Sequence, residues 1–406
     1  MNKDYLNELN KYGSKLGLDS INELLERLDN PQYELRVVHF AGTNGKGSTM
    51  NYLQSILLKA GYSVGTFASP AVFDDNEFIK VDGVNISDDD LDKYSSLVED
   101  ACQAMVKQGK DHPTRFEVET AIALCFFKDA NLDICLIECG MGGKEDATNV
   151  FSWKLASVIT RIGLDHREYL GDNLEEITRN KFGIVTDASP VVIGRQQPEV
   201  RELLEQLTEE KEVELYDSLE IDTDTYVNHR FTSYQEENIQ TAIRTALVLQ
   251  GKGFELEPYI EDGIESAKWP GRLEMIMNEP MFLIDGAHNP DGVRALKELL
   301  DNNFTNTTFT FIMSVLADKD YEKECEIITP MAKKVFTTTP RNARALDGQK
   351  LAEVVSKYNE NVTFVPEVDD IAGEALKYAK ANGADMIVAF GTLSYLKDLK
   401  AAALKF

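Results

Sequence analysis

Runs of apolar residues alternate with stretches of helical periodicity along nearly the whole chain. In the first part we expect strands and helices in turn; the strands are Val37–Ala41, Ser63–Phe67, Leu132–Cys139 and Leu155–Ile162, and the helices are Thr49–Lys59, Phe116–Lys128 and Leu174–Val185. The strands are continuous apolar runs, which is typical of strands buried on both faces. Helices between such strands predict a mainly parallel sheet that is covered on both sides.

The stretch Ala267–Arg272 interrupts this alternation, which then restarts. Beyond it we expect further strands and helices; the strands are Phe282–Asp285, Thr308–Ser314, Lys334–Thr339, Val362–Val365 and Met386–Phe390, and the helices include Gln349–Tyr358 and Ile371–Ala381. At roughly 100–200 residues per domain, a chain of 406 residues fits two domains. We therefore predict an α/β domain at 1–267 and a smaller α/β domain at 268–406.

The excess of acidic residues disfavours one class of partner, nucleic acid. The chain has 42 Lys and Arg against 69 Asp and Glu, a formal net charge of −27. Such a field repels nucleic acid, and there is no run rich in Lys or Arg, so we expect no nucleic-acid partner. The chain has no run of about 18 apolar residues, and its first residues are polar and mixed in charge, which predicts a cytosolic protein with no membrane partner.

A glycine-rich loop follows the first expected strand. It reads Gly42-Thr43-Asn44-Gly45-Lys46-Gly47-Ser48 and leads into a helix. Backbone N–H groups and the dipole at a helix N-terminus attract anions, and Lys46 adds a positive charge, so the loop is expected to bind phosphate groups. Its spacing differs from the usual G-x-x-x-x-G-K-[ST] pattern, because Gly47 separates Lys46 from Ser48.

This loop resembles the ATP loop of folylpolyglutamate synthases and bifunctional dihydrofolate synthases, which belong to the Mur-ligase superfamily. The resemblance continues along nearly the whole chain. Further matching motifs occur in the family's order; they are Glu138–Gly143, Asp146–Asn149, Gly163–His166, Trp269–Glu274 and Asp285–Pro290. Each motif alone is weak, but their number and order make the resemblance specific.

The resemblance implies a P-loop, parallel-sheet ATPase domain at 1–267, followed by a smaller, Rossmann-like glutamate-ligase domain at 268–406. It implies an ATP-dependent ligase that works as a monomer and converts a substrate carboxylate to an acyl phosphate, which the amine of L-glutamate then attacks. The carboxylate would belong to a folate, which is extended as a polyglutamate, or to dihydropteroate, which becomes dihydrofolate. The sequence leaves open whether one or both reactions occur.

A magnesium site is expected at the carboxyl edge of the first sheet. Glu138 ends one expected strand and His166 follows another, and ligands gather where parallel strands end. Because Mg²⁺ prefers oxygen ligands, chemistry alone leaves a structural role open for His166. The resemblance implies two Mg²⁺ ions, bound by Glu138, His166 and Ser69, with Ser48 as a further candidate ligand. It also leaves a monovalent cation open.

Lys181 has two interpretations. A lone lysine on an expected helix is ordinarily a solvated surface charge. In the resembled family a lysine at this place is carbamylated, and the resulting anion helps to hold the second Mg²⁺. The resemblance therefore implies carbamylation of Lys181, although Asn180 and Phe182 replace the family's usual neighbours. Lys46, Glu138, His166 and Lys181 are the expected catalytic residues.

Other residues are assigned to the nucleotide by resemblance. It implies that Asn238 lies near adenine and that Arg272 and Asp285 contact ATP. The guanidinium fork of an arginine suits phosphate geometry. His288 is assigned to the same set, and the alternative is a capped turn before the helix that starts at Pro290. We expect the incoming amino acid to be lined by Asp318, Lys319, Asp320 and Arg344.

Two departures from the family pattern concern the substrate. Ala71 and Phe78 stand where the family commonly has the histidine of Ser-Pro-His and the arginine of Asn-Glu-Arg-Ile. These changes leave the ATP chemistry unaffected, but they alter the way in which the pterin or its linker is held.

Three other functional classes fit parts of the sequence. The first is a non-catalytic, nucleotide-gated interaction protein, which the joint presence of Lys46, Glu138, His166 and Arg272 disfavours. The second is a kinase or simple ATPase, which would not need the second domain. The third is a Mur-type ligase that acts on another carboxylate, such as a cell-wall precursor, which the motifs at Asp146–Asn149 and Trp269–Glu274 disfavour.

Overall fold

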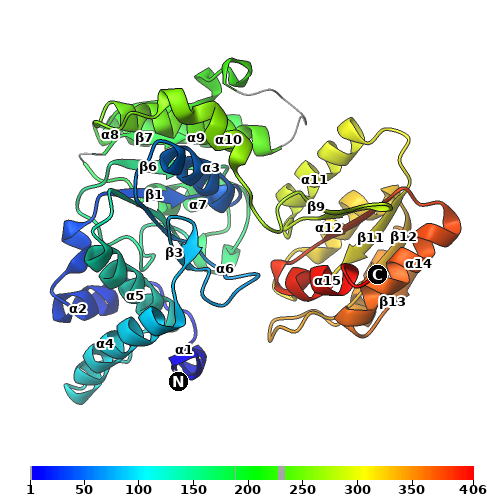
Figure 1. Ribbon diagram of the computed structural model, residues 1–406, viewed down its shortest axis with the longest axis horizontal. Helices are drawn as coiled ribbons and strands as arrows, with labels where there is room; N and C mark the ends of the chain where they lie inside the picture. The colour runs from blue at the N-terminus through cyan, green and yellow to red at the C-terminus, as the bar shows by residue number, and fades with distance from the viewer. Residues whose placement is uncertain (1, 188, 227–233) are drawn as a thin grey trace. The chain divides into compact units, whose positions relative to one another are not determined.

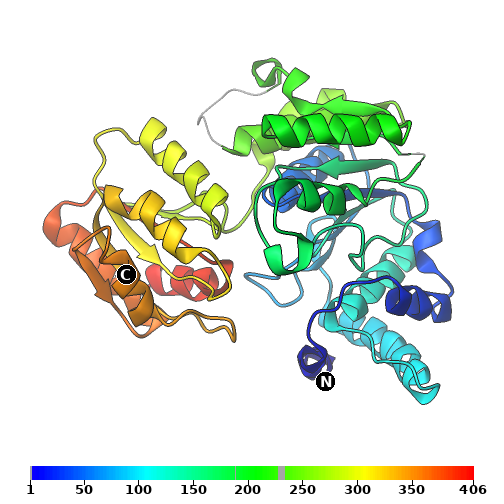
Figure 2. The ribbon, with the colours of Figure 1, turned by 180° about the vertical axis from the view of Figure 1, so that it is seen from behind.

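The computed structural model describes residues 2–187, 189–226 and 234–406. The chain forms two compact units, an N-terminal unit built mainly from residues up to Ala267 and a C-terminal unit built mainly from Lys268–Phe406. Figures 1 and 2 show both units from opposite sides, and each contains one central sheet with helices packed on it.

The N-terminal unit contains an eight-stranded sheet in the order β4-β3-β2-β5-β1-β6-β7-β8. The strands are β1 (Val37–Ala41), β2 (Val64–Phe67), β3 (Ile79–Val81), β4 (Val84–Asn85), β5 (Ile134–Glu138), β6 (Ala156–Ile159), β7 (Val191–Ile193) and β8 (Leu215–Asp217). All neighbours pair in parallel except β3 and β4, which are antiparallel at one edge. The predicted parallel sheet is confirmed. The strands β3, β4, β7 and β8 were missed because two or three residues are too few to give a periodic signal.

Helices cover both faces of this sheet. The helices are α1 (Asn2–Glu8), α2 (Asp19–Arg27), α3 (Lys46–Lys59), α4 (Asp88–Lys107), α5 (Arg115–Ala130), α6 (Arg167–Leu170), α7 (Leu174–Phe182), α8 (Pro198–Glu210), α9 (Tyr234–Gln250) and α10 (Ile260–Ser266). Successive strand side chains point to opposite faces. Val38 and Phe40 of β1 thus share a core with α3, α9 and α10, whereas Val37 packs in the core of α2, α4 and α5, and Ala41 in that of α7 and α8.

Helix starts depend on local capping. The structure starts α3 at Lys46, three residues before the predicted Thr49, because Gly45 at φ 89° turns the chain directly into the helix. Ser87 caps α4 by accepting a hydrogen bond from the Asp90 N–H. Thr114 and Glu117 form a capping box that fixes the first turn of α5.

The C-terminal unit contains a six-stranded sheet in the order β13-β12-β11-β14-β10-β9. Its strands are β9 (Glu274–Asn278), β10 (Met281–Ile284), β11 (Phe309–Met313), β12 (Ala332–Thr337), β13 (Val362–Phe364) and β14 (Met386–Phe390), and its helices are α11 (Pro290–Asn303), α12 (Tyr321–Ile328), α13 (Gly348–Val355), α14 (Val368–Asn382) and α15 (Leu396–Ala403). Only β9 is antiparallel. This second α/β sheet agrees with the predicted fold class, and β9 is the strand that the sequence did not predict.

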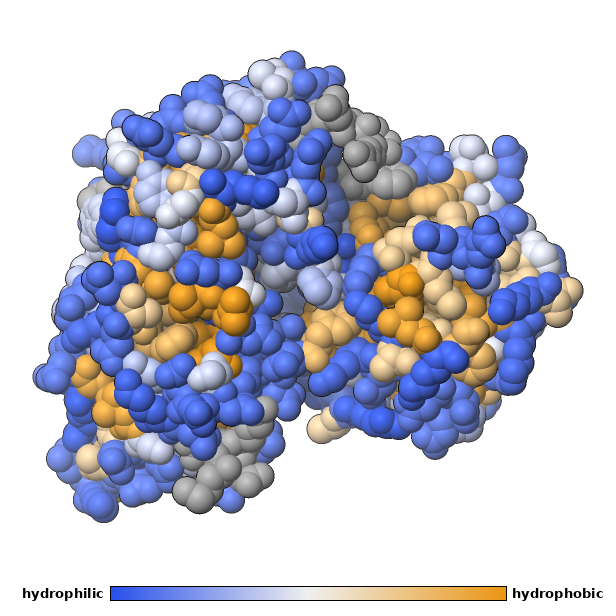
Figure 3. Space-filling view, viewed as in Figure 1, coloured by the Kyte–Doolittle hydropathy of each residue, from blue (hydrophilic) through white to orange (hydrophobic). Residues whose placement is uncertain are grey.

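The surface is mainly polar. Figure 3 shows hydrophilic side chains over most of the visible face, broken by smaller apolar areas, as the net charge of −27 leads one to expect. Within the described ranges, no helix is both long and apolar enough to cross a membrane.

Candidate active site

The glycine-rich loop joins β1 to α3 at the carboxyl edge of the N-terminal sheet. The backbone N–H groups of Thr43 and Asn44 both donate to the Arg161 carbonyl, at 2.9 and 3.1 Å. The Thr43 hydroxyl donates to the Gly163 carbonyl and accepts from the Gly163 N–H, both at 3.0 Å. The loop is therefore fixed to the segment after β6, and the first turn of α3 keeps N–H groups that have no partner within the helix.

Two glycines in the loop are required by close contacts. A Cβ on Gly42 would lie 1.9 Å from the Thr160 Oγ1, and one on Gly45 would lie 2.2 Å from the Asn238 Oδ1. Gly45 also has a φ of 89°, which L-residues rarely adopt. Asn238, which the resemblance assigned to the adenine side, thus lies directly against the loop, and its Nδ2 donates to the Gln235 Oε1 at 3.0 Å.

Two lysines meet at one carbonyl beneath the loop. Lys46 Nζ donates to the Gly42 carbonyl at 3.2 Å, and Lys181 Nζ donates to the same oxygen at 2.9 Å. Lys46 Nζ also lies 3.6 Å from Glu138 Oε1. The structure thus brings together three of the four predicted catalytic residues around a loop that is expected to bind phosphate.

Lys181 is buried, with 4% of its surface exposed, in contrast to an ordinary helical lysine. Burial, together with the nearby charge of Lys46, lowers the pKa of its amine to about 7. Near pH 7 about half of the amine is therefore in the uncharged form that acts as a nucleophile. The uncharged amine is the chemical state that carbamylation needs.

The remaining candidate metal ligands lie at the same edge of the sheet. Glu138 is the last residue of β5, and Ser69 follows two residues after β2, whose Phe67 pairs with Ile137. His166 lies after β6 in a left-handed conformation at φ 50°, and Asp165 accepts from its backbone N–H at 2.9 Å. Parallel strands place their carboxyl ends together, so these side chains share one edge.

The donor set suits Mg²⁺ that is completed by phosphate and water. Within the described ranges, no three or more His, Cys, Asp or Glu side chains form a group that could hold a metal on their own. Mg²⁺ commonly takes only one or two carboxylates together with waters and substrate phosphates. A buried Glu138 carboxylate beside the glycine-rich loop, with the Ser48 and Ser69 hydroxyls, is compatible with that arrangement.

A series of buried hydrogen bonds supports the loop after β5. Asp146, only 2% exposed, accepts from the Met141 N–H at 2.7 Å and from the Thr148 hydroxyl at 2.5 Å. The Thr148 hydroxyl lies 2.8 Å from the His39 Nε2 in β1. Burial lowers the pKa of His39 well below its usual range, so the ring is neutral. Asp146 was visible in a sequence motif, but its support by His39 was not.

A second buried lysine lies in the N-terminal unit. Lys154 Nζ donates to the Asn149 Oδ1 at 2.9 Å and to the Ile184 carbonyl at 2.5 Å, and the residue has no exposed surface. Burial lowers the pKa of its amine to about 7. Unlike Lys181, Lys154 makes no hydrogen bond to the glycine-rich loop among the bonds described.

The C-terminal unit holds the other assigned nucleotide residues. Asp285, which is 1% exposed, follows β10 and accepts from the Leu273 and Ala287 N–H groups, both at 2.9 Å. A Cβ on Gly286 would lie 2.2 Å from an Arg272 guanidinium nitrogen, so this glycine makes room for the arginine. His288 Nδ1 lies 2.7 Å from the Gly286 carbonyl, and Asn289 rather than His288 caps α11.

Two of the residues that were expected to line the site of the incoming amino acid form an ion pair with each other. Arg344 pairs with Asp318 at 3.2 Å on the surface of the C-terminal unit, and the Ala317 N–H donates to the Arg344 carbonyl at 2.8 Å. Asp320 caps α12 by accepting from the Lys323 N–H. Asp320 therefore has a local structural role, while Asp318 and Arg344 present charged groups to solvent.

Comparison with known proteins agrees with this architecture. The Mur ligase middle domain matches residues 40–255, and the Mur ligase glutamate ligase domain matches residues 271–393. The chain is 31% identical to the dihydrofolate synthase/folylpolyglutamate synthase of Bacillus subtilis, over 96% of this chain and 95% of that protein. The chain belongs to the folylpolyglutamate synthase/dihydrofolate synthase family of Mur ligases.

Other relatives of this ligase show the same extent of similarity. It is 34% identical to the folylpolyglutamate synthase of Lacticaseibacillus casei, over 80% of this chain and 81% of that protein. The solved structure of Escherichia coli FolC in complex with DHPP and ADP has a TM-score of 0.87 at 27% identity and covers 99% of this chain and 97% of its own. The Mycobacterium tuberculosis folylpolyglutamate synthase complexed with ADP and AMPPCP has a TM-score of 0.86 at 27% identity, with 96% and 95% covered.

Proposed function

We propose that this ligase uses ATP to join L-glutamate to the carboxylate of a folate, and that the same site can also act on dihydropteroate. The observation that carries the proposal is the cluster of Lys46, Lys181 and Glu138 at the Gly42–Ser48 loop. The printed names of the relatives support the choice of substrates, and ADP in the related solved structures supports the choice of nucleotide.

We assign a different part of the reaction to each of the two domains. Residues 1–267 would bind ATP, through the loop Gly42–Ser48 and Asn238, and residues 268–406 would serve as the glutamate-ligase domain. The further nucleotide contacts that we propose are Arg272, Asp285 and His288. We also propose that the protein acts as a monomer and binds no nucleic acid, because its net charge of −27 opposes that contact.

The loop residues would hold and orient the nucleotide. The N–H groups at the start of α3 would face the phosphates, and Lys46 would offset the negative charge that is transferred with the γ-phosphate. The substrate carboxylate attacks that phosphorus, ADP leaves, and an acyl phosphate forms. The amine of L-glutamate then attacks the acyl carbon, phosphate leaves, and an amide remains.

The proposed metal ligands are Glu138, His166 and Ser69, with Ser48 as a further hydroxyl and Lys181 as a ligand once it is carbamylated. Bound Mg²⁺ would neutralise phosphate charge and align the γ-phosphate with the carboxylate. Two ions fit this donor set if Lys181 becomes an anion; a monovalent cation is a further candidate.

Phosphate release tests the proposal. The purified protein is given ATP, Mg²⁺ and L-glutamate, and tetrahydrofolate or dihydropteroate is added in separate reactions. Release that depends on both L-glutamate and one of these acceptors, with a product heavier by one glutamate in mass spectrometry, is the expected result. If no phosphate is released with either acceptor, the folate assignment is refuted. The two separate reactions also show whether one or both acceptors are used.

A further inference from the structure

His39 is a polar residue at the centre of the N-terminal sheet. It lies in the middle of β1, pairs with Ile137 of β5 and Ser157 of β6, and has no exposed surface. A buried polar group destabilises a fold unless it is hydrogen-bonded, and an apolar side chain would pack at this place without that cost. The hydrogen bonds of His39 should therefore have a use that an apolar residue could not supply.

These hydrogen bonds run in one direction, toward a carboxylate. The Thr148 hydroxyl donates its single hydrogen to the Asp146 Oδ1 at 2.5 Å. The His39 Nε2, which lies 2.8 Å from the Thr148 oxygen, must then donate to it, so the neutral ring carries its hydrogen on Nε2. The Nδ1 is buried and has no hydrogen-bond partner within the described residues, and the opposite tautomer would bury an unpaired N–H there. His39 thus acts on Asp146 through Thr148.

Asp146 in turn fixes the turn that follows β5. Its Oδ2 accepts from the Met141 N–H at 2.7 Å, and its Oδ1 also accepts from the Thr148 N–H at 3.0 Å. At the start of the turn, the Cys139 Sγ lies 3.2 Å from the His39 Nε2. Since Glu138 is the last residue of β5, these contacts set the direction in which the chain leaves it.

The same turn packs against the last turn of α7. A Cβ on Gly143 would lie 2.7 Å from the Lys181 carbonyl oxygen, so the two backbones are in close contact. The Lys144 N–H donates to the Asn180 carbonyl at 2.8 Å. The backbone position of Lys181 therefore depends on the turn after β5.

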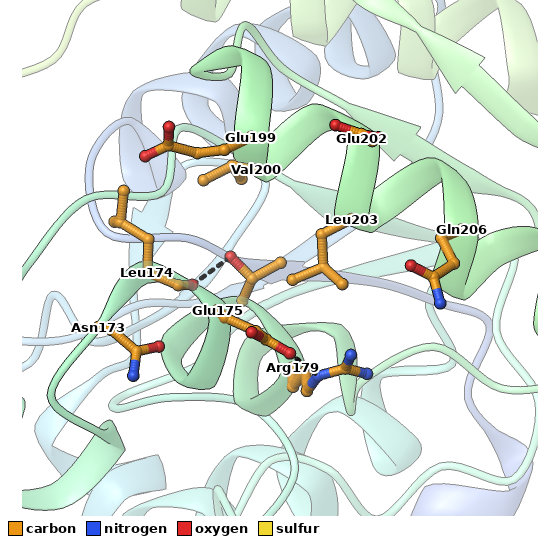
Figure 4. A pocket seen from close by; sticks show the side chains of 10 residues that line it. Asn173, Leu174, Glu175, Arg179, Glu199, Val200, Glu202, Leu203 and Gln206 are labelled. Carbon is orange, nitrogen blue, oxygen red and sulfur yellow. Dashed lines mark hydrogen bonds and ion pairs between the residues drawn. The ribbon is translucent and has the colours of Figure 1, made fainter.

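The packing of α7 against α8 is incomplete. A cavity of about 480 Å³ lies between these helices, and Figure 4 shows it lined by Leu174 and Arg179 from α7 and by Val200 and Leu203 from α8. A cavity removes contacts that would otherwise fix one helix against the other. This side of α7 thus leaves part of the constraint on its position to the turn after β5.

We propose that His39 is a positioning residue of this ligase. It acts through Thr148 and Asp146 on the turn after β5, and that turn sets the places of Glu138 and Lys181 at the glycine-rich loop. The inference rests on the proposed function, because it takes these two side chains as groups that act at the nucleotide.

The expected effect is on the rate of reaction rather than on the binding of ATP. A displacement of about 1 Å in a reacting group can slow a reaction by about 10². The glycine-rich loop itself is held separately, because the N–H groups of Thr43 and Asn44 donate to the Arg161 carbonyl and the Thr43 hydroxyl donates to the Gly163 carbonyl. ATP binding should therefore depend little on His39.

Two substitutions of His39 separate its donor from its ring. His39→Gln keeps an N–H donor near the place of Nε2, whereas His39→Met fills a similar space without one. In the assay of phosphate release with L-glutamate and the acceptor, His39→Met should lower kcat about tenfold or more, with the KM for ATP within about twofold of the wild type. His39→Gln should keep kcat within about threefold, and equal losses in both variants would exclude the donor as the cause.

A double-mutant cycle tests the route. Thr148→Val removes the hydroxyl and keeps the shape of the side chain. If His39 acts through Thr148, the double variant His39→Met/Thr148→Val should be no slower than Thr148→Val alone. Losses that multiply would overturn the proposed route.

Two control variants separate position from stability. Val38→Ala leaves a cavity in the same strand but on the opposite face of the sheet, and Leu203→Ala enlarges the cavity between α7 and α8. Each should lower the melting temperature and leave kcat within about twofold of the wild type. If either control lowers kcat as much as His39→Met at an equal loss of melting temperature, a general loss of packing accounts for the effect and the inference is overturned.

A measurement without turnover separates this inference from the proposed function. In the full chain labelled with ¹⁵N-methionine, the Met141 amide reports its bond to Asp146, and its NMR signal is assigned by its loss in Met141→Leu. Its hydrogen exchange should be about tenfold faster or more in His39→Met, and close to the wild-type rate in His39→Gln.

The outcomes are then distinct. Unchanged exchange in His39→Met would overturn the inference whatever the activity, and so would an unchanged kcat in a wild type that uses an acceptor. If the wild type releases phosphate with no acceptor, the proposed function fails, and faster exchange in His39→Met would still support the hold of His39 on the turn.

Discussion

The most informative perturbation concerns the amine of Lys181. Its pKa of about 7 compares with about 10.5 for an ordinary lysine, so near pH 7 about half of the amine is neutral, against about 1 part in 3,000. Carbon dioxide reacts only with the neutral amine, and the reaction releases a proton. Burial therefore raises the supply of reactive amine by ~10³, and we predict that Lys181 is carbamylated in the protein near neutral pH.

The pH dependence follows from the same shift. One unit below the folded pKa, only about a tenth of the amine is neutral, so at fixed, subsaturating CO₂ the carbamate should fall more than fivefold from about pH 7 to about pH 6. The full chain would be incubated with ¹³C-bicarbonate and its carbamate carbon followed by ¹³C NMR.

Two variants give this assay its control. Lys181→Met should remove one carbamate resonance that Lys154→Met keeps, which assigns that resonance to Lys181 although both lysines are buried and have a pKa of about 7. Lys181→Met should also lower kcat for phosphate release by ~10² or more, because an electrostatic group at the phosphates is lost. A carbamate spectrum that is the same in Lys181→Met as in the wild type, or that shows no carbamate in the wild type at about pH 8, would refute the reasoning.

Three further outcomes can be measured. Lys46→Ala should reduce kcat for phosphate release by ~10² or more with little change in the circular-dichroism melting curve, and retained turnover would exclude the loop as the phosphate site. Gly45→Ala should lower the free energy of unfolding by about 2–3 kcal/mol, because its Cβ would lie 2.2 Å from the Asn238 Oδ1. The control Gly253→Ala, at a similar φ of 94° and with no atom within 4 Å of the new Cβ, should lower it by about 1 kcal/mol. Equal losses in denaturant titrations would contradict the role of the contact with Asn238. The pKa of Lys154 is about 7 in the folded protein and higher in the unfolded chain, so above pH 7 the unfolded chain binds more protons and stability rises with pH. Relative to Lys154→Met, the free energy of unfolding of the wild type should therefore increase by about 2 kcal/mol between about pH 7 and about pH 9. Parallel pH profiles of the two proteins would exclude this linkage.

Much of the fold follows from short-range pattern. The centres of the long parallel strands were predicted, because strands buried on both faces must be apolar throughout, and β1 at Val37–Ala41 agrees to the residue. Errors occur at the ends: α3 starts at Lys46 rather than Thr49, since a glycine at positive φ can cap a helix without a polar signal. The short antiparallel strands β3, β4 and β9 pair through backbone contacts that depend on the rest of the sheet.

For the candidate site too, some features were predicted from the sequence and others depend on the fold. The residue pattern located the glycine-rich loop and placed Glu138 at a strand end, whereas only the resemblance to the ligase family assigned Lys181 to the same chemistry. Their states depend on the fold: Lys181 resembles a surface lysine in sequence, yet packing places it 2.9 Å from the Gly42 carbonyl and out of water. Burial and neighbouring charge change a pKa, and neither can be read from residues that are distant along the chain.

The sequence by itself therefore determined the α/β class, the glycine-rich loop between a strand and a helix, and the family, because these depend on local periodicity and on the order of motifs. Only the tertiary structure decided that Ala71, Phe78, Arg115 and Glu119 line one cavity and that Gly42 accepts hydrogen bonds from two lysines. The hydrogen bond from Lys181 to Gly42 joins residues that lie 139 positions apart. The free energy of burying a polar group depends on which partners the fold brings to it.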